Sequence, residues 1–73
     1  MSKHEQTIEG HVDSNVSMAI DQAHEYGGLV GAFDAFSQNT MDSVLEDGYS
    51  GDEAVNAGYW FRKKFSDATG VNP

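Results

Sequence analysis

Residues 19–35, AIDQAHEYGGLVGAFDA, decide the fold of this chain. Apolar residues recur every three or four positions on both sides of the glycine pair at 27–28, which is the spacing of one face of an α-helix. The strand-like alternation of polar and apolar residues is missing from this part of the sequence. The glycine pair therefore either separates two helices or lies inside a single long one.

The two alternatives give different molecules. With a turn at the glycines, helices over 13–26, 29–46 and 51–68 form a three-helix bundle, since helix connections in bundles can be as short as two residues. Without a turn, one helix over 13–46 is about 50 Å long at 1.5 Å per residue. The helix over 51–68 then covers only half of it, and a second copy of the protein has to cover the rest.

The small residues argue in both directions. Each glycine costs a helix interior up to about 1 kcal/mol relative to alanine, which favours a break. On an unbroken helix, however, small residues at every fourth position form a ridge that another backbone can approach closely. This ridge consists of Ala19, Ala23, Gly27, Gly31 and Ala35. It favours a helix that continues through the glycines, at most with a kink, and it is the predicted self-association surface.

The last third of the chain has the clearest helix signals. Ser50 and Glu53 have the spacing of a capping box, in which each side chain caps the free backbone amide of the other residue. Gly70 and Pro73 are typical of a helix end. Between these signals, small and aromatic residues share one helix face, which is the predicted core face: Ala54, Ala57, Gly58, Phe61, Phe65 and Ala68.

Length and composition limit the class of protein. A chain of 73 residues forms one domain, here an all-α helical hairpin or three-helix bundle, with the polar residues 1–11 loosely ordered. There is no cysteine, which excludes disulfides and thiolate metal sites. Chains this short often need self-association for stability, so we expect a homo-oligomer.

The charge indicates the kind of partner. Twelve acidic residues face four basic ones, which gives a net charge of −8. Nucleic-acid binding depends on Lys and Arg that neutralise phosphates, so direct binding of nucleic acid is not expected. Such a surface either keeps the protein soluble or binds a basic protein partner. Because no apolar run is long enough for a membrane span or a signal peptide, we expect a cytoplasmic protein that does not bind membranes.

The candidate binding segment is Tyr59-Trp60-Phe61-Arg62-Lys63. Consecutive side chains on a helix point about 100° apart, so one core face cannot bury all three aromatic rings. Tyr59 and Trp60 then lie at the flanks, where they either pack within the monomer or form an interface, since Tyr, Trp and Arg dominate binding hot spots. Alternatively, an aromatic ring stacks on a nucleotide base while Arg62 and Lys63 meet its phosphate.

A weaker candidate is a metal site. Asp21 and His24 are three residues apart on one helical face, with Glu25 adjacent, as in carboxylate-bridged metal sites of helix bundles. One such set supplies too few ligands, so a dimer would have to duplicate it. The alternative is a solvated histidine. No pattern of a nucleophilic site or a phosphate loop occurs, so we expect neither enzyme activity nor a cofactor.

These observations lead to three hypotheses. The first is a self-associating helical protein that regulates or inhibits a larger partner by occupying a basic surface, one that otherwise holds nucleic acid. The second is an oligomeric binder of a small anionic ligand such as a nucleotide. The third is a metal-binding helical protein. In size and charge the chain resembles compact accessory proteins of bacteria and their viruses, which act stoichiometrically on larger machinery, and this resemblance favours the first hypothesis.

Overall fold

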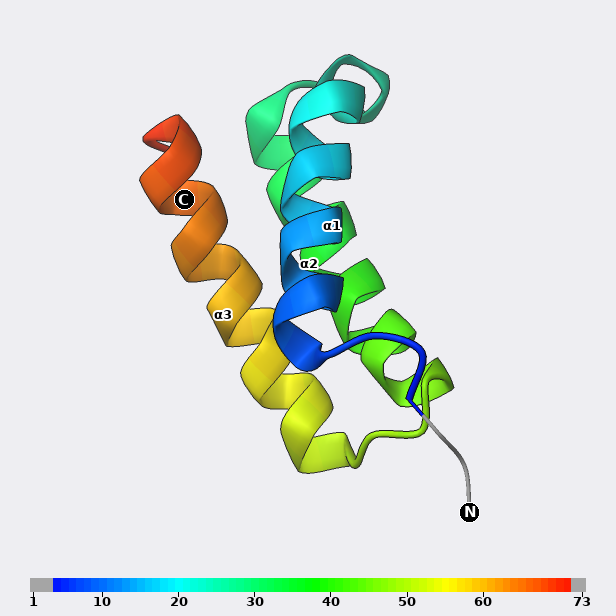
Figure 1. Ribbon diagram of the computed structural model, residues 1–73. Coiled ribbons are helices and arrows are strands. Elements are labelled where there is room, and N and C mark those ends of the chain that lie inside the picture. Colours follow the sequence, from blue (N-terminus) through cyan, green and yellow to red (C-terminus); the bar gives the residue numbers. More distant parts are fainter. Residues whose placement is uncertain (1–3, 72–73) are drawn as a thin grey trace.

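Three α-helices make up most of the chain in the computed structural model, which describes residues 4–71 (Figure 1). They are α1, Ile8–Gln22; α2, Leu29–Glu46; and α3, Gly51–Thr69, with a 3₁₀ turn over Ala23–Tyr26 before α2. There is no strand between residues 4 and 71. The predicted all-α fold is confirmed, in the form of the three-helix bundle.

The chain reverses direction at Gly27 and Gly28, so the unbroken helix favoured by the small-residue ridge is wrong. Both glycines have positive φ angles, 83° and 107°, which residues with a side chain rarely adopt. The amide of Gly28 donates to the carbonyl of Ala23 at 2.9 Å and closes the turn. α2 therefore runs back beside α1 (Figure 1), where it buries its apolar face without a second copy of the chain.

α1 begins at Ile8, five residues before the predicted start at Asp13. Thr7 caps it, because its hydroxyl oxygen accepts the amide proton of Gly10 at 3.0 Å. Residues 8–11 are thus helical rather than loosely ordered as expected, while residues 1–3 lie outside the described part of the chain. The expectation was wrong because Ile8 packs against the core, so this first turn has an apolar contact of its own.

The core lies between all three helices and centres on aromatic rings. Phe61 and Phe65 are fully buried and stack at 5.5 Å, and Phe33 meets the ring of Phe65 edge-on at 5.8 Å. Small residues let the helices approach, and at Gly58 an added Cβ would lie 2.9 Å from Cγ of Met41. The predicted core face of α3 is confirmed except at Ala68, which is exposed near the end of the helix.

The predicted capping box of α3 is present. The Ser50 hydroxyl accepts the Glu53 amide proton at 3.2 Å, and the Glu53 carboxylate accepts the Ser50 amide proton at 3.0 Å. The helix ends at Gly70, whose φ of 77° lies in the left-handed region. Pro73, the other predicted end signal, lies outside the described residues. The start of α3 therefore agrees with the prediction, and its end is one residue beyond it.

Candidate functional site

A groove runs between α2 and α3 on the side that faces away from α1. It holds a hollow of about 200 Å³, which we call the α2/α3 groove, lined by Ser37, Met41, Val55, Gly58, Tyr59 and Arg62.

Two sets of polar contacts show on which side of the helix pair this groove lies. α1 contacts both helices of the pair. The Asn15 side-chain oxygen accepts from the Asn39 side chain of α2 at 2.6 Å, and the Asp13 carboxylate accepts from Lys64 of α3 at 2.8 Å. Ser37 precedes Asn39 by two residues and Arg62 precedes Lys64 by two, so each points about 200° around its helix from the contact with α1. Arg62 Nε donates to the Ser37 hydroxyl at 3.0 Å, on the side of the helix pair that faces away from α1. Within residues 4–71, no helix covers this side.

The groove exposes apolar side chains, with Tyr59 64% and Val55 49% exposed and Met41 half-buried. Gly58 is buried beneath Met41, which packs so closely on it that any side chain at 58 would collide with the methionine. Clustered apolar surface of this kind marks interaction sites on soluble proteins.

Both helices of the groove expose carboxylates to solvent. Asp34 and Asp42 lie on the exposed side of α2, with Gln38 between them, and Asp52 lies on the exposed side of α3. In residues 4–71 none of these three carboxylates forms an ion pair. The only cation that lines the groove is Arg62, whose Nε donates to Ser37 and whose guanidinium carbon lies 5.9 Å from the centre of the Phe33 ring. The groove is thus lined by apolar side chains, the Ser37 hydroxyl and one cation, with Lys63 in the hollow that adjoins it.

The structure separates the four residues of the predicted binding segment. Tyr59 and Arg62 line the groove, and Lys63 lines a neighbouring hollow of about 590 Å³ together with Arg62. Trp60, 38% exposed, lies on the other flank of α3, where Lys64 Nζ is 5.1 Å from its ring centre. Lys64 itself pairs with Asp13 and Glu9 of α1. Tyr59 and Trp60 therefore do not form one pocket for a stacked base.

The residues of the predicted self-association ridge have roles inside the monomer. Ala19 is fully buried in the core, and Ala23 and Ala35 are half-buried. Gly27 forms the turn, and a Cβ on Gly31 would lie only 1.7 Å from the Tyr26 carbonyl oxygen. Because the helix breaks, these residues form no continuous surface, and the ridge prediction is corrected accordingly.

Within one chain, the predicted metal ligands do not converge on a site, and duplication across a dimer stays a prediction. Asp21, His24 and Glu25 are all exposed near the end of α1, and His24 Nε2 lies 4.0 Å from the Glu25 carboxylate. In the described residues, no group of three His, Asp or Glu side chains is arranged to hold a metal ion. The 3₁₀ turn over Ala23–Tyr26 replaces the regular helix on which the predicted Asp-x-x-His face depended.

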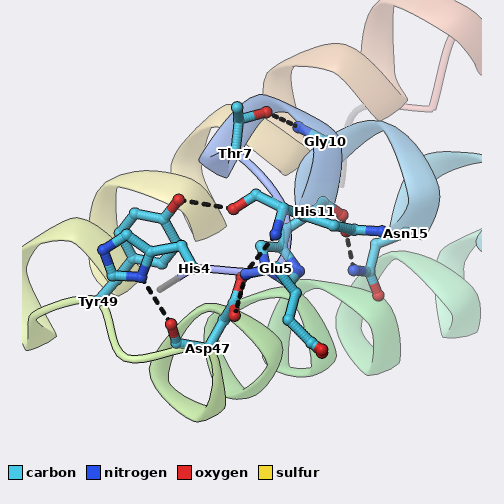
Figure 2. A network of polar contacts seen from close by, with 9 residues as sticks. His4, Glu5, Thr7, Gly10, His11, Asn15, Asp47 and Tyr49 are labelled. Atoms are coloured by element: carbon cyan, nitrogen blue, oxygen red, sulfur yellow. Dashed lines mark hydrogen bonds and ion pairs between the residues drawn. The ribbon is translucent and has the colours of Figure 1, made fainter. Parts of the chain in front are cut away.

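A polar cluster that sequence analysis did not find holds the start of the chain to the loop between α2 and α3 (Figure 2). The Asp47 carboxylate accepts the amide protons of Glu5 at 2.7 Å and Gln6 at 3.0 Å, and His11 Nε2 lies 2.7 Å from it. His4 Nδ1 lies 2.7 Å from the Asp47 carbonyl oxygen. We call this arrangement the Asp47 clasp.

Tyr49 closes the same cluster from the other side. Its ring stacks on His4 with a centre-to-centre distance of 3.7 Å, and its hydroxyl donates to the Gln6 carbonyl at 2.6 Å. The Glu5 amide, the His11 side chain and the Gln6 amide lower the pKa of Asp47 from 3.8 to about 2. These contacts hold residues 4–11 against the loop between α2 and α3.

Comparisons with protein-family models, curated proteins and solved structures give no match for this chain. Within residues 4–71, none of the helices combines the length and apolar character that crossing a membrane requires. The argument for function therefore rests on the shape and charge of the chain itself.

Proposed function

We propose that the chain is a small acidic binding protein that docks on a basic surface of a larger partner protein and thereby regulates or inhibits it. The observation that carries this proposal is the exposed groove between α2 and α3 on a chain of net charge −8. The exposed carboxylates Asp34, Asp42 and Asp52 form no ion pair within residues 4–71. Charge alone would favour solubility only. The exposed Tyr59 and Val55 side chains in the groove add the apolar anchor that protein interfaces need.

The cations are few. Lys64 is engaged with Asp13 and Glu9, while Arg62, whose Nε donates to the Ser37 hydroxyl, keeps its charge and lies with Lys63 beside the groove. The acidic character is therefore that of the chain as a whole, with a net charge of −8. A protein of this size that covers a basic surface competes with whatever else binds there, including nucleic acid. That competition is the proposed means of regulation.

The other two hypotheses stand differently. For a nucleotide site, Tyr59 and Arg62 line one groove and Lys63 adjoins Arg62, whereas Trp60 lies on the other flank of α3 and takes no part in that group. A metal site would need its ligands to converge, and Asp21, His24 and Glu25 are exposed side chains near a turn. Self-association stays a prediction from chain length, which light scattering at micromolar concentration tests, with a mass of 7.9 kDa as the result against it.

The experiment is affinity capture from cells of the native host with matched charge variants. Asp34→Asn with Asp42→Asn removes two carboxylates on the exposed side of α2, while Asp21→Asn with Glu25→Gln removes two at the far end of α1. We expect the captured partner to be lost with the first pair and kept with the second, and raised salt to release it because exposed charges are screened. Equal capture by both variants contradicts the proposal.

A further inference from the structure

We infer that the α2/α3 groove and the hollow that adjoins it bind a small phosphate monoester with a flat aromatic group, such as a mononucleotide. The aromatic group lies against Tyr59 in the groove, and the phosphate lies beside Arg62 and Lys63. This inference is independent of the proposed function, because it concerns a small molecule that the chain binds without a protein partner.

The site follows one face of α3. Tyr59, Arg62 and Ser66 are three or four residues apart, so their side chains share one face of the helix, and Lys63 borders that face. Tyr59 lines the groove of about 200 Å³, Lys63 and Ser66 line the hollow of about 590 Å³, and Arg62 lines both. From Tyr59 to Lys63 the helix rises about 6 Å, a span that one mononucleotide covers.

Arg62 is anchored through one nitrogen only. Its Nε donates to the hydroxyl of Ser37 at 3.0 Å, and Ser37 is itself buried. The guanidinium carbon lies 5.9 Å from the centre of the Phe33 ring. Within residues 4–71, the two terminal nitrogens of Arg62 form no hydrogen bond and no ion pair. They therefore present the fork that binds a phosphate group with two parallel hydrogen bonds.

The charge of the site differs from that of the chain as a whole. Twelve acidic residues outnumber four basic ones, yet Arg62 and Lys63 form no ion pair in residues 4–71, whereas Lys64 pairs with two carboxylates. Asp67 is the one acidic residue among those that line the two hollows. Two adjacent cations suit a phosphate monoester, which carries about −1.5 to −2 at pH 7, better than a singly charged carboxylate.

The apolar lining of the groove indicates the other end of the ligand. Tyr59 is largely exposed and Met41 is half-buried, so the groove offers an aromatic ring and a thioether to a flat aromatic group. Every nucleobase can stack on an aromatic side chain, and methionine sulfur contacts aromatic rings favourably. An inorganic anion would leave this lining exposed to water. The site therefore fits a ligand that has both a ring and a phosphate.

A titration followed by nuclear magnetic resonance tests the inference with three probes. They are adenosine monophosphate, adenosine, which lacks the phosphate, and inorganic phosphate, which lacks the ring. We expect the monophosphate to shift the amide resonances of residues 37–41 and 59–66. We also expect it to bind at least about tenfold more tightly than adenosine or inorganic phosphate.

Two neighbouring lysines give a matched pair of variants. Lys63→Gln and Lys64→Gln each remove one positive charge, so the variants have the same net charge, but only Lys63 lines the site. We expect Lys63→Gln to weaken binding of adenosine monophosphate about tenfold and Lys64→Gln to change it by less than about twofold. Tyr59→Ala should also weaken binding, and Asp67→Asn should strengthen it. Unchanged helical circular dichroism shows that each variant keeps the fold.

Several results would overturn the inference. They are no binding of adenosine monophosphate at about 10 mM, equal binding of the monophosphate and one of the other two probes, and resonance shifts centred on α1. Equal loss of binding in Lys63→Gln and Lys64→Gln would also overturn it, because binding would then respond only to the net charge of the chain. None of these results bears on the docking of a protein partner, which capture from the native host tests separately.

Discussion

Asp47 fixes the first described residues of the chain through its carboxylate, and its pKa makes this role testable. Because hydrogen bonds from the Glu5 amide, His11 and the Gln6 amide lower the pKa to about 2, the ionised form stabilises the folded state. This contribution is complete above the ordinary value of 3.8 and is lost as the pH falls towards 2.

We therefore expect Asp47→Asn to destabilise the protein near neutral pH, and the difference from the native chain to shrink as the pH falls from about 5 to 3. Urea unfolding at a series of pH values measures the loss of unfolding free energy in the variant and how that loss changes with pH. Asp42→Asn is the control, since that carboxylate is exposed on α2 and has only a side-chain amide partner at 3.2 Å. A difference that stays constant down to pH 3 contradicts the role given to Asp47.

Gly31 shows a close contact that a helix-propensity argument misses. Alanine is the better helix former by up to about 1 kcal/mol, so propensity alone predicts that Gly31→Ala stabilises the protein. Its Cβ would instead overlap the Tyr26 carbonyl oxygen, and we expect a loss of about 1–3 kcal/mol. Gly51→Ala, where the new Cβ meets open space, should cost nothing. A gain in unfolding free energy at Gly31 would show that the turn before α2 is looser than described.

At the scale of the helix, α3 depends on its cap because it carries the two fully buried phenylalanines, Phe61 and Phe65. We expect Ser50→Ala to lower the unfolding free energy by about 0.5–2 kcal/mol. Glu53→Gln should have a smaller effect, because Gln can still accept the Ser50 amide proton. Ser17→Ala, at an exposed position inside α1, is the control. Equal stability of the Ser50 and Ser17 variants in chemical denaturation contradicts the assigned start of α3.

The helices differ in how far the sequence could predict them. α3 was predictable because its cap, its apolar face and Gly70 are all local signals. The break at Gly27-Gly28 was not, because local propensity favoured a turn while the ridge of small residues favoured continuity. What decides it is the burial of α2 against α1, including Phe36 and Ala32, which depends on the folded molecule.

At the scale of the whole molecule, the candidate site combines predicted and unpredicted residues. Tyr59 and Arg62 were found from the sequence, because helical periodicity places both outside the core face of α3. Met41 could not be assigned to the groove from the sequence, since nothing local shows on which side α1 packs. The Asp47 clasp joins residues 36 to 43 positions apart in the sequence, and no motif signals contacts at that separation.

The measurement that tests the central claim most directly is site-specific photo-crosslinking in cells of the native host, with a photoreactive amino acid at Tyr59 or at Trp60. These neighbours lie on different flanks of α3, with Tyr59 lining the α2/α3 groove and Trp60 on the flank towards α1. We predict that position 59 crosslinks to a Lys- or Arg-rich surface segment of one partner protein, identified by mass spectrometry, and that position 60 does not. Crosslinking at position 60 alone, or to an acidic segment, would contradict the claim that a basic partner docks in the α2/α3 groove.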